Sequence, residues 1–412
     1  MSTDADAVIQ SAADPIALAR IPFNRPSIEG EEIELMRAAV EQSGHTSADG
    51  PFSAQAAALL REEVGARDVL LTTSCTAALE MSALLLDIGP GDTVVVPSFG
   101  FVTTALAFVR QGARVLFCDI DERTLGLDPN HLAKLMDPTV RAVVPIHYAG
   151  IACDVDAIRA VLVEWPRAEL VEDNAHGLFG RRNGEPLGSF GRFSALSFHE
   201  TKNFICGEGG ALVINRAEDV ERAHVMYHKG TNRQAFLLGQ VDKYSWQDIG
   251  SSFGLADVLA AFLYGQLQRR DSILAKRRAA FDRYERLLAP HAERFGFRLP
   301  EVPAGCEQAY HMFYVLLPDQ ETRNHSLDAL QARGIYATFH YVPLHSSPGG
   351  RRFAARETEC PVTDSVSGRL LRLPFFTNLT DDDAERVADE FLATLGGLDS
   401  PDARRRLTDP VG

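Results

Sequence analysis

Apolar residues recur along the chain in two rhythms that alternate with each other. Short runs without polar alternation, at 69–71, 93–96 and 114–118, predict strands that are buried on both faces. Between such runs, apolar spacings of three and four residues predict helices, for example at 77–86 and 154–163. Strands that alternate with helices indicate a mainly parallel sheet covered by helices on both faces, which is the α/β class.

The same reading extends over the rest of the chain. It predicts further strands at 142–145, 169–172, 193–198 and 211–214, and helices at 29–42, 52–64, 101–110, 217–228 and 255–284. Beyond Pro290 the pattern changes to isolated strands (311–317, 337–340) and helices (326–333, 382–395), which predict a smaller α+β domain. We therefore expect a flexible lead-in (1–20), a large domain with an extended N-terminal arm (21–268), a small C-terminal domain (269–398) and a flexible tail (399–412).

Composition narrows the class of protein. The 412 residues are 45% hydrophobic and 24% charged, as in soluble globular proteins. A net charge of −15 argues against binding to nucleic acid or to an anionic membrane surface. The six cysteines form no Cys-x-x-Cys pair, which argues against a zinc site or a disulfide framework. No apolar run is long enough to span a membrane and the first residues do not resemble a signal peptide, so we expect a cytoplasmic protein.

One lysine stands in an unusual setting. Lys202 lies between the apolar run 193–198 and the glycine-rich turn 207–210. A lysine that is taken out of water can lose its proton and form a Schiff base with an aldehyde, and pyridoxal phosphate (PLP) is the commonest such aldehyde in enzymes. Taken alone, an exposed lysine on a turn is the simpler interpretation.

Other turns that follow strands carry the groups that PLP requires. Residues 72–77 open a helix with hydroxyls and free amides, which suits a phosphate. Asp173 suits a protonated pyridine nitrogen, His176 could reach the ring hydroxyl, and Phe99 or Phe101 could lie against the ring. Each has a plainer alternative, as a helix cap or a core residue, but together they occur in the order that PLP chemistry needs.

The residues also carry a family resemblance, which spans roughly residues 21–395. The chain resembles the sugar-nucleotide (DegT-type) aminotransferases, PLP enzymes of the aspartate-aminotransferase-like fold type I that work as homodimers. Its motifs look closest to those of the dTDP-4-amino-4,6-dideoxygalactose transaminases. The matching strings lie at 21–24, 74–77, 97–99, 147–150, 197–203, 230–233, 239–244 and 339–345.

The resemblance implies roles for individual residues. Lys202 is the expected Schiff-base lysine and Asp173 the partner of the pyridine nitrogen, with Phe101 on the ring. The phosphate would be held by Cys75, Thr76, Ala77 and Ser197. Two departures leave choices open: many relatives have Gln in place of His176, and Ser252 or Asn232 would replace an Asn that many relatives supply from the partner subunit. Candidate substrate contacts are His199, Arg233, Lys243, Tyr244, His340, Tyr341 and His345.

The function implied by the resemblance is transfer of an amino group from L-glutamate, by way of pyridoxamine phosphate, to the 4-keto carbon of a dTDP-4-keto-6-deoxyhexose. The product would be dTDP-4-amino-4,6-dideoxy-D-galactose. Alternatives are a 4-amino-gluco or 3-amino product, or a non-catalytic sensor with this fold. A serine hydrolase is a further reading, because 250–254 matches Gly-x-Ser-x-Gly, but no buried strand precedes it. None of the 12 histidines lies in a His-Glu-x-x-His zinc motif, and we expect no metal.

Overall fold

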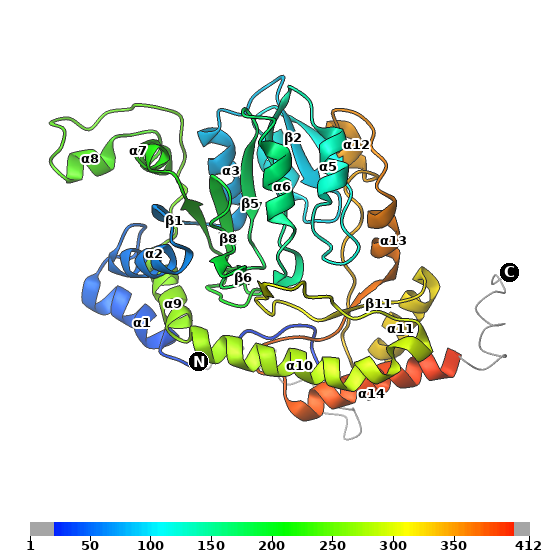
Figure 1. Cartoon of the computed structure of the whole chain (residues 1–412). Helices are drawn as coiled ribbons and strands as arrows, with labels where there is room; N and C mark the ends of the chain where they lie inside the picture. The colour runs from blue at the N-terminus through cyan, green and yellow to red at the C-terminus, as the bar shows by residue number, and fades with distance from the viewer. Residues whose placement is uncertain (1–19, 399–412) are drawn as a thin grey trace, which may run out of the picture.

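The computed structural model describes residues 20–398, so the expected lead-in before residue 20 and the tail after residue 398 lie outside the described part. Its centre is a sheet of seven strands, in the spatial order β1 (Asp68–Thr72), β9 (Gly210–Ile214), β8 (Phe193–Ser197), β5 (Glu169–Asp173), β4 (Val140–Val143), β2 (Thr93–Pro97) and β3 (Arg114–Cys118) (Figure 1). Within this sheet only β9 runs antiparallel to its neighbours. The predicted α/β class with a mainly parallel sheet is confirmed.

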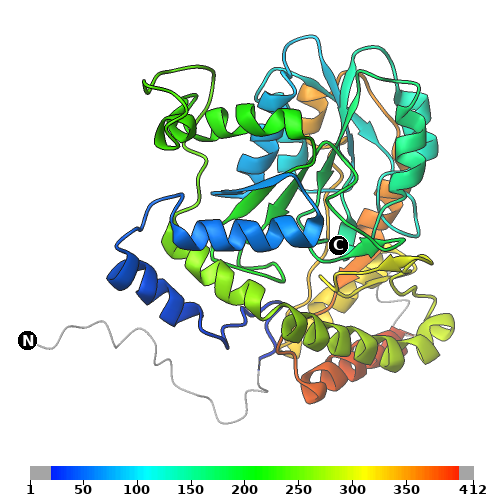
Figure 2. The same ribbon diagram turned by 60° about the vertical axis from the view of Figure 1, so that its left-hand side comes forward.

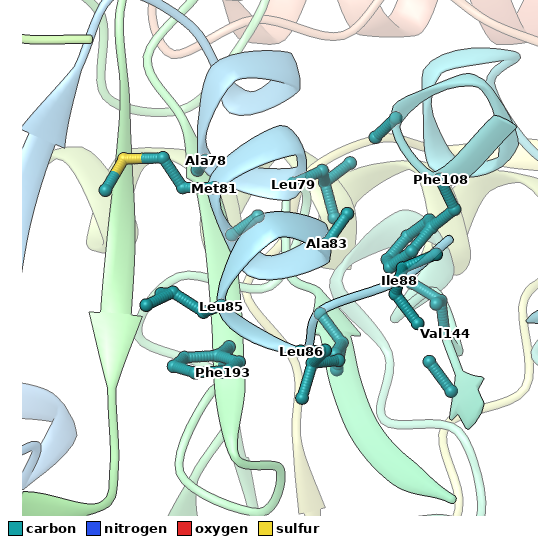
Figure 3. Packing of buried hydrophobic residues seen from close by; sticks show 14 of the residues in the cluster. Ala78, Leu79, Met81, Ala83, Leu85, Leu86, Ile88, Phe108, Val144 and Phe193 are labelled. Carbon is teal, nitrogen blue, oxygen red and sulfur yellow. The ribbon is translucent and has the colours of Figure 1, made fainter. Parts of the chain in front are cut away.

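Helices cover both faces of the sheet, which explains the uninterrupted apolar runs. All five residues of β2 are buried. Val94 and Val96 belong to a cluster with α3 (Cys75–Leu85), α4 (Thr103–Val109) and α7 (Val220–Tyr227), whereas Val95 packs with α5 (Pro129–Leu135) and α6 (Val155–Leu162) on the other face. Figure 3 shows how Leu79 and Ala83 of α3 lie toward Phe108 and Val144. On the same face as α5 and α6, α2 (Pro51–Val64) and α9 (Asp257–Gln268) pack on β1 and β9.

The C-terminal part builds a second core beside the sheet. The long α10 (Arg270–Phe295) packs along α14 (Asp381–Leu398), with α11 (Gln320–Ala332) and the pair β11 (Tyr314–Leu316) and β12 (Leu370–Arg372) behind them (Figures 1 and 2). Ile21 of the N-terminal arm joins this second core, since its amide bonds to the Gly334 carbonyl and its carbonyl accepts from Tyr336. The predicted boundary between residues 268 and 269 stays a prediction.

Several elements differ from the sequence prediction. The expected single helix at 255–284 is two helices, because the backbone leaves the helical region at Arg269 (φ −92°, ψ 10°), and α10 then runs on through Pro290 to Phe295. Residues 337–340 form only an isolated bridge, Thr338 to Arg372. The remaining elements are α1 (Glu32–Ala38) with a π-turn (Ala39–Ser43), the 3₁₀ turns Tyr148–Gly150 and Ala217–Asp219, β6 (Arg181–Arg182), β7 (Glu185–Pro186), α8 (Arg233–Leu237), β10 (Cys306–Glu307), α12 (Pro348–Phe353) and α13 (Pro361–Arg369). Among residues 20–398, no helix combines the length and the apolar character needed to cross a membrane.

Candidate functional site

A cavity of about 580 Å³ lies where turns after the sheet strands meet the C-terminal part of the chain. Ligands collect at this edge in α/β folds, because the carboxyl ends of parallel strands meet there. Ten of the predicted site residues line the cavity: Cys75, Thr76, Phe101, Asp173, His176, Ser197, His199, Lys202, His340 and Tyr341. Residues distant in sequence are therefore brought together as the order of motifs predicted.

The beginning of α3 reaches this cavity at Cys75 and Thr76. Ser74 caps the helix, because its Oγ accepts the amide N–H of Ala77 at 3.1 Å. First-turn amides of a helix have no acceptor within the helix, so those of Cys75 and Thr76 suit an anion such as phosphate. Gly210 of β9 lies against this turn, and a Cβ there would stand 2.3 Å from the carbonyl carbon of Ser74. Only glycine lets the strand approach the turn so closely.

Asp173, the last residue of β5, is a buried carboxylate in the cavity wall. Its Oδ2 accepts the Thr104 hydroxyl at 2.6 Å, and its Oδ1 accepts the amide of Ala175 at 3.2 Å. Burial raises the pKa of Asp173 in spite of these hydrogen bonds. The raised pKa means that the charge is incompletely compensated, so a cationic ligand atom would be favoured beside it.

Lys202 lies in the turn between β8 and β9, where its amide donates to the carbonyl of His199 at 2.9 Å. Burial lowers the pKa of its ammonium to about 8, although Cys75 and Asp173 act in the opposite direction. A sizeable fraction of the amine is therefore neutral near physiological pH. A neutral amine can act as a nucleophile or accept a proton, which an ordinary exposed lysine rarely does.

His176 stacks on His311, with ring centroids 4.2 Å apart and an interplanar angle of 16°. The amide nitrogen of Asn203 donates to the Ala309 carbonyl, so its Oδ1 is left to accept the Nδ1–H of His311 at 3.0 Å. Burial lowers the pKa of both rings, which keeps them neutral. The Nδ1 atom of His176 is buried without a hydrogen-bond partner among the described residues.

The sequence analysis missed Arg372, which also lines the cavity. Its Nη1 donates to Nε2 of His340 at 2.5 Å, and its guanidinium lies 4.5 Å from the ring centroid of Phe23. Because arginine can only donate, His340 accepts through Nε2 and directs its Nδ1–H to the Tyr148 hydroxyl at 3.2 Å. Burial and the Arg372 charge lower the pKa of His340 to about 2. A charged residue inside the apolar run 370–376 was the available signal. Other cavity residues outside the predicted set include Phe23, Ser74, Thr103, His311 and Thr338.

Seven predicted site residues do not line this cavity among the residues described: Ala77, Asn232, Arg233, Lys243, Tyr244, Ser252 and His345. Asn232 closes its own loop, because its side chain donates to the Lys243 carbonyl and accepts the Ser245 amide. His345 bonds through Nδ1 to the Ser98 hydroxyl at 2.7 Å. Ser252 pairs with His228 in an isolated bridge. The roles proposed for these residues stay predictions.

Comparison with models of protein families shows which family the chain belongs to. The model of the DegT/DnrJ/EryC1/StrS aminotransferase family matches residues 26–392, which is most of the chain. The chain belongs to this family. The family resemblance read from the sequence is thus confirmed, and the protein is a PLP-dependent aminotransferase of the type I fold.

Individual relatives agree with this assignment. The spore coat polysaccharide biosynthesis protein SpsC of Bacillus subtilis (strain 168) is 32% identical over 388 residues, covering 92% of this chain and 98% of SpsC. The aminotransferase TlmJ from Streptoalloteichus hindustanus is 31% identical with a TM-score of 0.84, covering 92% of this chain and 100% of TlmJ. Spr1654 from Streptococcus pneumoniae, solved in a PLP form, is 23% identical with a TM-score of 0.84, over 93% of this chain and all of Spr1654, and shares the fold.

The cavity of this DegT-family chain fits PLP better than the rival cofactors or mechanisms. It combines unpaired helix amides, an under-compensated carboxylate, a lysine of lowered pKa and the unpartnered His176 Nδ1. The described residues include no cluster of three or more His, Cys, Asp or Glu side chains that could hold a metal. The segment 250–254 is irregular and ends three residues before α9, so it is not the strand–elbow–helix of a serine hydrolase.

Proposed function

We propose that this aminotransferase transfers the amino group of L-glutamate to the 4-keto carbon of a dTDP-4-keto-6-deoxyhexose, giving dTDP-4-amino-4,6-dideoxy-D-galactose and 2-oxoglutarate. The observation that carries amino transfer is the meeting of Lys202 and Asp173 in one cavity, the lysine with a pKa near 8. Support for a sugar comes from SpsC, which is named for polysaccharide biosynthesis, and from the strings shared with dTDP-4-amino-4,6-dideoxygalactose transaminases.

Different residues would hold the phosphate, the pyridine nitrogen and the ring face of PLP. Ser74, Thr76 and the first amides of α3 would receive the phosphate, together with Ser197. Asp173 would keep a proton on the pyridine nitrogen, and Phe101, whose side chain is exposed into the cavity, would cover a ring face. When bound, PLP supplies an electron-withdrawing ring that stabilises negative charge on the carbon that loses a proton.

The chain's own part in the chemistry is proton movement and orientation. The Nζ atom of Lys202 would accept the proton that leaves the donor carbon in the first half-reaction and pass it to the cofactor carbon next to the nitrogen, and in the second half-reaction it would move a proton from there to the acceptor carbon. Its lowered pKa lets the amine alternate between both forms near neutral pH. The Thr104 hydroxyl fixes the carboxylate of Asp173 through the 2.6 Å hydrogen bond. The neutral His176–His311 stack gives the cavity a flat, uncharged wall.

The direct test incubates the purified protein with L-glutamate and, in separate reactions, dTDP-4-keto-6-deoxyglucose or its 3-keto isomer. We expect 2-oxoglutarate and a 4-amino sugar nucleotide whose proton couplings show an axial amine at C4. An equatorial amine or an amine at C3 would overturn the galacto assignment but not sugar transamination. If neither keto-sugar isomer gave an amino sugar and no 2-oxoglutarate formed, the proposed function would be overturned. Lys202→Ala is the inactive control.

We also propose that the protein works in the cytoplasm as a homodimer, in accordance with the family resemblance. The segment 230–250 supports a partner contact, because it projects beside the sheet (Figure 1). It also carries exposed apolar side chains. Leu237 is 67% exposed and Trp246 is 83% exposed. Apolar side chains so exposed and so close in sequence are typical of a surface that another chain covers.

A further inference from the structure

Residues 309–311 form a strained turn beside the cavity. Tyr310 has a backbone φ of 52°, in the left-handed region that residues other than glycine rarely adopt. Strained backbone of this kind persists only where the surrounding structure imposes it, and it is concentrated at ligand sites. The next residue, His311, lines the cavity. The contacts that impose the strain are therefore candidates for a functional role.

Two buried side chains bind all three carbonyl groups of this turn. Asn203 donates from Nδ2 to the Ala309 carbonyl at 2.6 Å. Arg277 donates from Nε to the Tyr310 carbonyl at 2.7 Å and from Nη2 to the His311 carbonyl at 2.6 Å. An arginine suits two neighbouring carbonyls, because its planar guanidinium presents several N–H groups in a fixed geometry. The strained conformation is thus held by side chains from two distant parts of the chain.

Arg277 keeps its charge in the interior of the protein for this contact. It is only 2% exposed, and burial lowers the pKa of its guanidinium to about 9. Its Nη1 donates to the Thr377 hydroxyl at 3.3 Å, so its three nitrogens bind two carbonyls and a hydroxyl and no carboxylate. Every nitrogen of Arg277 is therefore used within the chain, and its role is to hold the turn rather than to bind a ligand.

The turn presents the ring of His311 to His176. The Nδ1–H of His311 donates to Oδ1 of Asn203 at 3.0 Å, which fixes the direction of the ring. The rings of His311 and His176 stack with their centroids 4.2 Å apart. The Tyr148 ring meets His176 edge-on, with the centroids 5.9 Å apart. These contacts hold the His176 ring in one orientation in the cavity wall.

This orientation decides which nitrogen of His176 can meet a ligand. Its Nδ1 is buried without a hydrogen-bond partner among the described residues, so Nε2 is the nitrogen left to face the cavity. Burial lowers the pKa of the ring and keeps it neutral, and the nearby Lys202, His340 and Arg372 act in the same direction. A neutral ring carries one N–H, and burying an N–H without an acceptor is costly. The proton therefore lies on Nε2, and His176 offers a hydrogen-bond donor to the cavity.

We propose that Arg277, Asn203 and His311 are positioning residues that hold His176 with its Nε2–H directed at the ring oxygen of bound PLP. The proposal depends on the PLP site and not on the identity of the sugar, so it would survive a failure of the proposed acceptor. Asn203 directly follows Lys202 in the chain. The side chain that orients His311 thus belongs to the same turn as the lysine, which sets the lysine and the donor from His176 in a fixed relation.

A pH titration of the visible absorption band of the PLP-loaded protein tests this without turnover. The proton that titrates lies on the nitrogen that joins PLP to Lys202 and is shared with the ring oxygen. A hydrogen-bond donor to that oxygen withdraws charge from it, so the proton leaves at lower pH. We expect Arg277→Gln and His311→Phe to raise the midpoint by about one pH unit, which is about tenfold in proton affinity. His176→Phe removes the donor and should raise the midpoint at least as far.

The conservative variant Arg277→Lys should give a midpoint between wild type and Arg277→Gln, because an ammonium does not reproduce the geometry of the guanidinium. The matched control is Arg323→Gln, which should leave the midpoint unchanged. Arg323 is also buried, but it lies over Phe339, and its Nε and Nη1 bind no group of the described chain.

A wild-type midpoint in PLP-loaded Arg277→Gln and His311→Phe would overturn the positioning role, since a merely structural role would lower thermal stability and leave the midpoint in place. A wild-type midpoint in His176→Phe would overturn the contact with the ring oxygen. If Arg277→Gln does not fold, Arg277→Lys and His311→Phe decide between these outcomes.

Discussion

Burial shifts the pKa values of Lys202 and Asp173 in opposite directions. Burial disfavours either charged form, so it lowers the pKa of the lysine and raises that of the aspartate. Their mutual attraction only partly reverses both shifts. The cavity thus provides a neutral amine and a carboxylate that gains from a cationic partner, which are the two states that capture of PLP requires.

This predicts the pH dependence of PLP capture by PLP-free protein. The neutral amine reacts with the aldehyde, so the rate should rise with pH around a midpoint of about 8, below the ordinary lysine value. Stopped-flow absorbance measures this rate. Asp173→Asn should lower the midpoint, because the aspartate charge stabilises the ammonium, whereas Lys243→Ala should leave it unchanged. A midpoint above pH 10 in wild type would contradict the account.

Sequence reasoning found these two residues because each lies at or shortly beyond the end of a buried strand, Asp173 at the end of β5 and Lys202 after β8. It missed Arg372 and His311 because their importance arises from contacts with residues far away in the chain, Phe23 and His176. The role of His345 as a substrate contact stays a prediction; its ring bonds to Ser98 and is not among the residues that line the cavity. A histidine's neighbours decide between these roles, and local spacing does not give them.

Among the elements, the start of α3 depends most directly on its neighbour β9. The backbone of Ser74 and Cys75 lies so close to Gly210 that no side chain fits between them. The position of the α3 amides therefore depends on one glycine in the adjacent strand, and so does any phosphate site that these amides form. The sequence placed a glycine-rich turn there but could not indicate what it contacts.

We predict that Gly210→Ala weakens PLP binding by about tenfold or more, because overpacking of this kind costs about 1–3 kcal/mol and displaces the helix start. Equilibrium dialysis with PLP measures the affinity. Gly89→Ala is the control, since an added Cβ there meets no atom within 4 Å. Unchanged PLP affinity in Gly210→Ala would show that the α3 turn does not hold the phosphate.

The elements themselves were predictable where the pattern was local. The run 114–118 is apolar after Arg114, and the strand has these limits in the structure. The antiparallel direction of β9 was not predictable, because a buried strand has the same pattern in either direction. The break at Arg269 also has no periodic signal: the Arg269 side chain pairs with Glu29 and Glu32, which belong to the distant N-terminal region.

At the scale of the whole molecule, the N-terminal arm links the C-terminal core to the site. Ile21 is buried in the C-terminal core, and two residues later Phe23 lies under Arg372 in the cavity. The packing of Ile21 in the C-terminal core therefore positions Phe23 under Arg372 in the cavity. Sequence reasoning expected an extended arm from its prolines but not its contact with Arg372.

The proposed homodimer gives a prediction at this scale. Sedimentation equilibrium should give twice the chain mass of 45.1 kDa. Replacing Leu237 and Leu238 by Ser should shift the protein toward monomer, because the substitutions remove exposed apolar area that would be buried against the partner. Val163→Ser is the control, since Val163 is 79% exposed but lies at the end of α6, away from the segment 230–250. A wild-type monomer would reject the homodimer.

The most direct test of the central claim is to find where PLP attaches. The chain has only five lysines, at 134, 202, 229, 243 and 276, so borohydride reduction of the PLP-loaded protein followed by peptide mass spectrometry can distinguish them all. We expect one stoichiometric adduct, on Lys202, and no visible absorption band or adduct in Lys202→Ala. An adduct spread over the other lysines, or none after incubation with PLP, would contradict it.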